Sequence, residues 1–265
     1  MPQILFPADY AYVQEAVVAA GRKLLQTSNA VLHTKRHALD LVTQADLDSE
    51  EFLRTKLTKK FPSFGFYSEE TAKESEKELE KELVWIVDPL DGTLQFSRNL
   101  PFFGVSVGLM RQGKPVAGFI YLPKFDDLFH AQKGSGAYSG KKQIHVAMRD
   151  YPTKSVGVLS YTELRDDQQQ NLHDIFTQDN VPMLRIGSAI FQLAHTAAGH
   201  YDLYVCLNNA LWDLAGGWAI VEEAGGAVEV WIDEKKKKAG NFYHVSFIAS
   251  SHGTVHRLLQ KLKSL

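Results

Sequence analysis

The sequence predicts a layered protein of helices and strands, of either the α/β or the α+β class. In the second half of the chain, apolar runs of strand length alternate with amphipathic runs of helix length. In the first half, two amphipathic helical patterns precede a series of apolar runs of strand length. The chain has 265 residues, which suits one or two domains and is enough to bury a substantial core.

The first half starts with two predicted helices. Residues 10–27 carry apolar side chains at three- and four-residue steps, which is typical of a helix with one buried side. A second helical pattern covers residues 46–60, and Pro62 ends it. Its apolar side is expected to consist of Leu47, Phe52, Leu53 and Leu57. The strands predicted after this helix cover residues 64–68, 83–87, 103–110 and 115–122.

Two segments among these strands have both a structural and a functional interpretation. The charge-dense run 71–83 is typical of a solvated helix or loop, and the alternative is a flap beside a site. The glycine-rich run 134–140 resembles a phosphate-binding loop in composition. No helical pattern follows it, however, so a hairpin or loop is the favoured interpretation.

The second half alternates regularly between the two kinds of element. Strands are predicted at residues 155–160, 182–186, 201–205, 227–231 and 245–250. Helices are predicted at residues 163–177, 188–198, 213–224 and 254–263. A candidate boundary near residues 148–154 divides the chain into residues 1–150 and 151–265. The run Lys235–Lys238 is interpreted as a solvated loop, with a phosphate- or RNA-contact patch as the alternative.

The composition excludes several classes of protein. Apolar residues make up 45% of the chain and the net charge is −2, so intrinsic disorder and nucleic-acid binding are not expected. No apolar run approaches the length that spans a bilayer. The first seven residues lack a secretory signal pattern, and the single cysteine, Cys206, cannot form an internal disulfide. We therefore expect a cytoplasmic protein without a membrane partner.

The segment DPLDGT, residues 88–93, follows an apolar strand directly. Asp88 and Asp91 stand three residues apart, and two such close carboxylates repel each other unless a cation lies between them. Hard cations such as Mg²⁺ prefer oxygen ligands of this kind. Thr93 adds a hydroxyl, and the amides of Gly92 and Thr93 could face an anion if a helix begins there. The alternative is an ordinary capping turn between a strand and a helix.

Further acidic residues stand at similar junctions. Glu69 and Glu70 follow a predicted strand, Asp213 starts a helical pattern after Trp212, and Asp46 starts another. Taken singly, each has a structural alternative, because Asp46 and Asp213 could be helix caps and Glu70 could be solvated.

Together these segments resemble the inositol monophosphatase family, which comprises metal-dependent, lithium-sensitive phosphatases. The resemblance covers about residues 10–260 and rests on five segments in the family's order. DPLDGT matches DPxDGT, WDLAGG from Trp212 matches WDxAxG, DLVTQAD from Asp40 matches DxVTxxD, SEE from Ser68 matches GEE, and Gly187-Ser188-Ala189 matches G[ST]A. The resemblance implies a five-layered αβαβα sandwich, a homodimer and a small phosphorylated metabolite as substrate.

The resemblance also implies a set of metal ligands. Glu69, Asp88 and the carbonyl group of Leu90 would hold one Mg²⁺. Asp88, Asp91 and Asp213 would hold a second, and Glu69 would help to bind a third, looser ion. Residues 1–150 would then carry most of the ligands and residues 151–265 the remaining aspartate, in one compact catalytic unit.

Catalytic and substrate-binding roles follow in the same way. Thr93, hydrogen-bonded to Asp46, would orient the attacking water together with the metal ligand Glu69. The amides of Gly92 and Thr93 would hold the phosphate. The remaining substrate contacts would come from Asp91, Gly187, Ser188, Ala189, Cys206 and Asp213. Lys35 stands where the family often has a basic residue near the site.

Three departures from the family pattern concern the substrate. Cys206 stands where many inositol-specific members have a glutamate that contacts inositol hydroxyls, Ser68 replaces a glycine, and Gln95 replaces an asparagine. Inositol monophosphate remains the first candidate. Fructose 1,6-bisphosphate, 3′-phosphoadenosine 5′-phosphate and histidinol phosphate are the alternatives within the same chemistry. A non-catalytic regulatory protein on a phosphatase scaffold is the alternative from another class.

Overall fold

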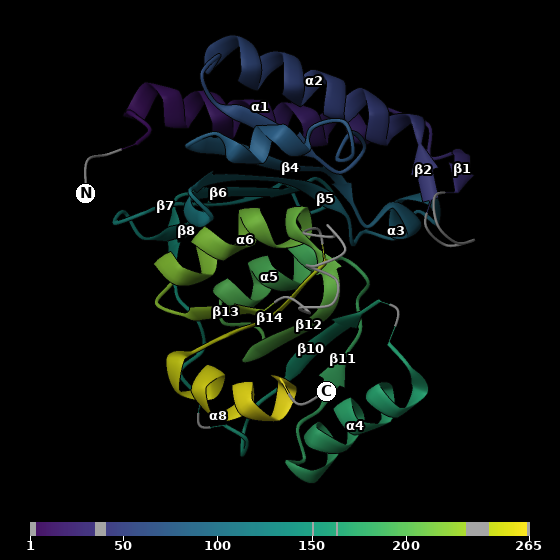
Figure 1. Ribbon diagram of the computed structural model, residues 1–265, viewed down its shortest axis with the longest axis vertical. Helices are drawn as coiled ribbons and strands as arrows, with labels where there is room; N and C mark the ends of the chain where they lie inside the picture. Colours follow the sequence, from purple (N-terminus) through teal and green to yellow (C-terminus); the bar gives the residue numbers. More distant parts are fainter. Residues whose placement is uncertain (1–3, 35–40, 150, 163, 232–243, 264–265) are drawn as a thin grey trace.

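The computed structural model describes residues 4–34, 41–149, 151–162, 164–231 and 244–263, and these form five layers (Figure 1). Helices α1 (Pro7–Leu24) and α2 (Gln44–Lys60) cover the outer face of a seven-stranded sheet. Helices α5 (Ala189–Ala197) and α6 (Leu211–Glu223) separate that sheet from a five-stranded sheet. Helices α4 (Asp166–Gln178) and α8 (His252–Lys263) cover the far face. The αβαβα sandwich that the family resemblance implies is confirmed.

The larger sheet has the strand order β3-β4-β5-β6-β7-β8-β9. Its strands are β3 (Gly65–Ser68), β4 (Leu83–Asp91), β5 (Gly104–Arg111), β6 (Lys114–Leu122), β7 (Asp127–Gln132), β8 (Ala137–Ser139) and β9 (Lys142–Ile144). Strands β3 and β4 are parallel, so their carboxyl ends lie at the same edge of the sheet. The other neighbours are antiparallel. The glycine-rich run 134–140 belongs to the β7–β8 hairpin, as expected.

The smaller sheet has the order β11-β10-β12-β14-β13. Its strands are β10 (Gly157–Tyr161), β11 (Met183–Leu184), β12 (Leu203–Ala210), β13 (Ala227–Trp231) and β14 (His244–Ser250). Because β11, β10 and β12 are parallel, their carboxyl ends share one edge. The chain enters α5 shortly after β11 and α6 directly after β12, so both helices begin at that edge.

Several short elements complete the described fold. They are the two-stranded sheet of β1 (Val31–Thr34) and β2 (Leu41–Thr43), the 3₁₀ helix η1 (Glu76–Glu80) and the short helix α3 (Thr93–Ser97). The charge-dense run 71–83 thus contains one helical turn, whose Glu78 carbonyl group packs against Gly65 at the start of β3. Movement of this run as a flap stays a prediction.

Two local predictions were wrong. Strand β4 does not end before Asp88 but continues to Asp91, because a register shift lets Asp91 still pair with Gly104 of β5. On α2, Leu53 and Leu57 are buried as predicted, but Leu47 is 38% exposed. Its place on the buried side is taken by the polar residues Asp46, Ser49 and Glu50.

The remaining predictions concern the boundary between the two halves, the lysine run and membrane-spanning helices. The boundary predicted near residues 148–154 falls between β9 of the larger sheet and β10 of the smaller one. The division into two halves nevertheless stays a prediction, because α5 and α6 of the second half pack on both sheets. The run Lys235–Lys238 lies outside the described residues. In the described ranges, every helix is too short or too polar to cross a membrane.

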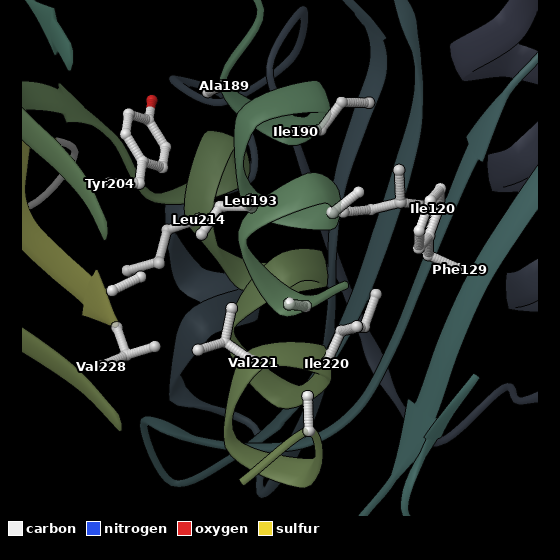
Figure 2. Close-up of a cluster of buried hydrophobic side chains, with 14 of the residues drawn as sticks. Ile120, Phe129, Ala189, Ile190, Leu193, Tyr204, Leu214, Ile220, Val221 and Val228 are labelled. Carbon is white, nitrogen blue, oxygen red and sulfur yellow. The ribbon is translucent and has the colours of Figure 1, made fainter. Parts of the chain in front are cut away.

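The central core joins the two sheets through α5 and α6 (Figure 2). Ile190 of α5 and Ile220 of α6 point toward the larger sheet, which contributes Ile120 and Phe129. Leu193 of α5 instead packs against Gly217 of α6. On the other side, the buried side chains come from both helices and the smaller sheet, and they include Leu214, Val221, Tyr204 and Val228. This packing fixes the start of each helix relative to the end of β4.

Helix α6 approaches the larger sheet unusually closely through glycines. Gly108 and Gly118 are cross-strand partners on β5 and β6. A Cβ atom at Gly118 would lie 1.9 Å from the carbonyl oxygen of Gly216, and one at Gly108 would lie 2.5 Å from the carbonyl carbon of Ala215. Ala215 and Gly216 of the WDLAGG segment therefore lie directly on the sheet, and this contact sets the depth of α6.

Replacing Gly118 by alanine is expected to lower the free energy of unfolding by about 1–3 kcal/mol, because the backbone of α6 must move away from the sheet. Urea unfolding checks this. The matched control is Gly253→Ala on α8, where an added Cβ meets no atom within 4 Å. That variant is expected to be as stable as the wild type or slightly more stable. A Gly118→Ala protein with wild-type stability would show that α6 has room to move.

Candidate active site

Four acidic residues from three separate elements come together at one edge of the larger sheet. Glu69 follows β3, Asp88 and Asp91 lie at the end of β4, and Asp213 lies in the first turn of α6. Carboxylate oxygens of Asp88, Asp91 and Asp213 lie within 4.8 Å of one another. The charge of Glu69 is close enough to raise the pKa values of all three aspartates.

Local hydrogen bonds explain how the backbone holds these residues. The N–H group of Glu69 donates to the carbonyl oxygen of Val87 at 3.2 Å, which continues the parallel pairing of β3 and β4 by one residue. Asp213 Oδ2 accepts from the N–H group of Ala210 at 3.1 Å at the start of α6. Asp213 is thus a capping residue, as one alternative held, and it also faces the other aspartates.

The cluster carries several negative charges in a buried place. Asp88 is completely buried, and no hydrogen-bond partner of its Oδ2 atom is found in the described part of the chain. Burial raises the pKa of Asp88 well above its ordinary value, and the charges of Glu69, Asp91 and Asp213 raise it further. Burial likewise raises the pKa of Asp213, with repulsion from Asp91 and Glu69.

This electrostatic arrangement fits a divalent cation. Clustered carboxylates in a low-dielectric site are costly when ionised, and a hard cation with oxygen ligands removes that cost. The unpartnered Asp88 Oδ2 is an oxygen that such a cation could use. The residues present therefore fit the metal that the sequence predicts.

Asp91 is held by the start of helix α5. Ser188 Oγ donates a short hydrogen bond to Asp91 Oδ2, and the amides of Ala189 and Ile190 donate at 3.2 and 3.3 Å. Burial raises the pKa of Asp91 to about 6 in spite of these donors. The Ser188–Ala189 segment thus lies at the site, where it binds Asp91.

Two glutamine side chains hold the segment before this helix. Gln95 Nε2 donates to the carbonyl oxygen of Ile186, and Gln192 Oε1 accepts from the N–H group of Ile186, both at 3.2 Å. Gly187 follows with a positive φ of 86°, a conformation that favours glycine. Gln95 therefore links the turn after β4 to the start of α5, a role the sequence did not predict.

Thr93 lies between Asp46 and the backbone of β4. Its Oγ1 atom lies 3.0 Å from Asp46 Oδ1 and 3.1 Å from the carbonyl oxygen of Leu90, so the expected bond to Asp46 is present. Gly92 precedes Thr93 as the cap of α3. Asp46 Oδ2 accepts from Thr43 and so caps α2, and burial raises the pKa of Asp46 to about 6.

Of the remaining residues that the sequence singled out, Cys206 lies near the acidic cluster. Cys206 lies on β12, completely buried, and burial raises the pKa of its thiol to about 12. It is close enough to Asp91 and Asp213 for their charges to act on it, but direct contact with a substrate stays a prediction. Lys35 and Asp40 lie outside the described residues.

The sequence interpretation missed two polar residues of α2 next to the site. Ser49 Oγ donates to the carbonyl oxygen of Pro89 at 2.8 Å. Glu50 accepts a hydrogen bond from the N–H group of Glu70 at 3.1 Å. Both residues follow Asp46 by one helical turn and therefore lie on the same side of α2. This spacing from Asp46 could have identified them in the sequence.

The charge cluster leads to a prediction on stability. Replacing Asp88 by asparagine is expected to raise the free energy of unfolding by about 1–2 kcal/mol at pH 8 in EDTA, because one buried negative charge disappears. The control is Asp179→Asn. Asp179 accepts from Tyr151 at 2.7 Å and pairs with Lys261 at 3.2 Å, so its loss should destabilise the protein. An Asp88→Asn protein less stable than the wild type in EDTA would contradict the predicted repulsion.

Comparison with known proteins gives a consistent result. Residues 5–263 match the model of the inositol monophosphatase family. An inositol-1-monophosphatase of Caulobacter vibrioides is 34% identical over 259 residues, which cover 94% of this chain and 99% of that protein. Inositol monophosphatase 3 of Solanum lycopersicum is 37% identical over 224 residues, which cover 81% of this chain and 82% of that protein.

Solved structures agree with these matches. The extragenic suppressor protein suhB of Bartonella henselae has a TM-score of 0.81 and 32% identity, and the match covers 97% of this chain and 98% of that one. The IMPase of Thermotoga maritima has a TM-score of 0.78 and 26% identity, with 96% of each chain covered. Fold, acidic cluster and sequence matches lead to one conclusion: the chain belongs to the inositol monophosphatase family and is a phosphoric monoester hydrolase.

Proposed function

We propose that this protein is a Mg²⁺-dependent phosphatase that hydrolyses inositol monophosphate by attack of water. The observation that carries the proposal is the buried group of Asp88, Asp91 and Asp213, whose carboxylate oxygens lie within 4.8 Å of one another. The substrate is supported by the names of two relatives, at 34% and 37% identity, which are both inositol monophosphatases. Fructose 1,6-bisphosphate, 3′-phosphoadenosine 5′-phosphate and histidinol phosphate are the alternative esters.

The chain's own residues would divide the work as follows. Glu69, Asp88 and the Leu90 carbonyl group would hold one Mg²⁺, and Asp88, Asp91 and Asp213 would hold a second. Glu69 would also contribute to a third, looser ion. When bound, such ions lower the pKa of water and stabilise charge on the phosphate and the leaving oxygen.

The other groups would position the reactants. Asp46 accepts from the Thr93 hydroxyl at 3.0 Å, so the threonine oxygen can in turn accept a hydrogen bond from the attacking water and orient it. A proton taken from this water would pass through the hydroxyl to the Asp46 carboxylate. The amides of Gly92 and Thr93 would hold the phosphate. The alcohol part of the substrate would lie toward Asp91 and the Gly187–Ser188–Ala189 segment, with Cys206 and Asp213 beside it.

A panel of the four esters, with Mg²⁺ and with EDTA, tests the proposal. We expect inositol 1-phosphate to be cleaved with the highest kcat/KM and release of phosphate to stop in EDTA. Faster cleavage of another ester would support the metal-dependent mechanism but contradict inositol monophosphate as the substrate. No release from any ester at saturating Mg²⁺ would contradict the proposal and favour a regulatory protein on this scaffold.

We further propose that the protein is cytoplasmic, homodimeric and inhibited by lithium. Lithium addition to the panel assay and analytical ultracentrifugation check the last two properties. Activity unchanged by millimolar lithium, or a monomer at assay concentration, would contradict them.

A further inference from the structure

The inner face of α2 carries a polar stripe where a helix of this kind normally buries apolar groups. Asp46, Ser49 and Glu50 are 1%, 2% and 4% exposed. They stand at positions i, i+3 and i+4, so they lie next to one another on one side of the helix. Each binds a different segment of the site. Asp46 binds Thr93, Ser49 binds the carbonyl group of Pro89, and Glu50 binds the segment after Glu69.

Glu50 has the most extensive set of contacts in this stripe. Its Oε1 atom accepts from the Thr71 hydroxyl at 2.7 Å and from the Arg54 guanidinium at 2.8 Å. Its Oε2 atom accepts from the N–H group of Glu70 at 3.1 Å. Arg54 also hydrogen-bonds Thr71 and lies over the ring of Phe66, 4.4 Å from its centroid. Arg54 therefore balances the charge of the Glu50 carboxylate, and the three hydrogen bonds fix its position.

These contacts hold Glu69 from both sides. Its own N–H group is bonded to Val87, one residue before Asp88, and the next N–H group along the chain, that of Glu70, is bonded to Glu50. The backbone of Glu69 is thus tied to β4 on one side and to α2 on the other. Asp46 and Glu50 share one rigid helix, so the Thr93 turn and the Glu69 segment are positioned by the same element.

We propose that Glu50 is a positioning residue, which sets the place of Glu69 relative to Asp88 for binding of a divalent cation. The inference rests on the proposed function insofar as it uses the same metal site. Groups that orient metal ligands without touching the metal commonly change affinity by about 10–100-fold when they are removed.

The carboxylate chemistry of Glu50 is essential to this role. All three neighbours donate hydrogen bonds to it, namely Arg54, Thr71 and the N–H group of Glu70. A glutamine would have to turn its NH₂ group toward either Arg54 or the Glu70 N–H group, and either orientation places donor against donor. Glu50→Gln therefore keeps the size of the side chain and disturbs the Glu69 segment.

The test is direct Mg²⁺ binding to the metal-free protein by calorimetry. We expect Glu50→Gln to weaken Mg²⁺ binding about 10-fold or more. At saturating Mg²⁺, we expect kcat to recover to within about threefold of wild type. General destabilisation of the fold would not weaken Mg²⁺ binding while leaving kcat nearly unchanged. The matched control is Glu51→Gln, the exposed neighbour on the same helix, which should bind Mg²⁺ like the wild type.

A second variant covers the case in which Glu50→Gln does not fold. Thr71→Val removes one donor to Glu50 without a change of charge, and it should weaken Mg²⁺ binding by a smaller factor, about threefold. Wild-type Mg²⁺ affinity in a folded Glu50→Gln protein, or in Thr71→Val if Glu50→Gln does not fold, would overturn the inference.

Mg²⁺ binding and ester cleavage by the wild-type protein distinguish failure of this inference from failure of the proposed function. A wild-type protein that binds Mg²⁺ but cleaves no ester would contradict the proposed function alone. A wild-type protein that binds no Mg²⁺ would overturn both.

Discussion

Replacement of Asp91 by asparagine is expected to lower kcat for phosphate release by about 10³-fold at saturating substrate and Mg²⁺. The variant loses one charged ligand of the proposed second metal, and metal stabilisation of the transition state is worth several kcal/mol. The side chain keeps its shape, and its amide oxygen can take the place of Oδ2 toward Ser188 and Ile190. The hydrogen bond from the Ala189 amide to Oδ1 is then lost, and the two bonds to Oδ2 should keep the start of α5 in place. Initial rates with inositol 1-phosphate measure the effect.

The control for this variant is Asp48→Asn. Asp48 is exposed on α2 and accepts from Gln44 at 2.7 Å, so its loss should leave kcat unchanged. If Asp91→Asn retained more than about a tenth of wild-type kcat, Asp91 would not be a ligand that the reaction needs.

Replacement of Thr93 by valine is expected to lower kcat about 10²-fold with little change in Mg²⁺ affinity. Valine has nearly the same shape but no hydroxyl, so the contacts to Asp46 and to the Leu90 carbonyl group are lost. A group that positions and deprotonates water contributes about 10²–10⁴-fold to a rate. Serine at this position keeps the hydroxyl, so Thr93→Ser should retain most of the activity. Equal losses in the two variants would mean that the side chain acts through packing instead.

The sequence predicted those site residues that stand in short local motifs. Asp88, Asp91 and Thr93 are within six residues of one another, and a strand that ends in such a segment brings them together without information from elsewhere. Asp213 is more than a hundred residues away. Only the resemblance to a family linked it to the others, because its place depends on how deeply α6 lies against the sheet.

The long-range contacts that set this depth have no local signal. Gly118 and Gly216 each look like an unremarkable small residue in the chain, yet they bring two backbones together. The same holds for Gln95 and Gln192, which hold Ile186 from opposite sides. Hydrophobic periodicity cannot find such pairs, since it describes one element at a time.

The pattern of α2 misled the prediction in an instructive way. Apolar spacing indicated a buried side that included Leu47, but the helix turns Asp46, Ser49 and Glu50 inward instead. Buried polar residues are expected where a site needs them and their hydrogen bonds are satisfied. Chain turns can also bring together residues that do not share a helical face. Helix α5 ends at Ala197, and the following turn places the Nδ1 atoms of His195 and His200 2.7 Å apart.

The most direct test of the metal site is a crystal structure of the protein soaked in Mn²⁺, with data collected for anomalous scattering. The acidic cluster predicts a strong anomalous peak between Asp88, Asp91 and Asp213, and a second peak beside Glu69 and the Leu90 carbonyl group. The same soak with Asp91→Asn should lose the first peak. A wild-type map with no peak at these carboxylates, from crystals of a protein that still releases phosphate, would contradict the metal mechanism.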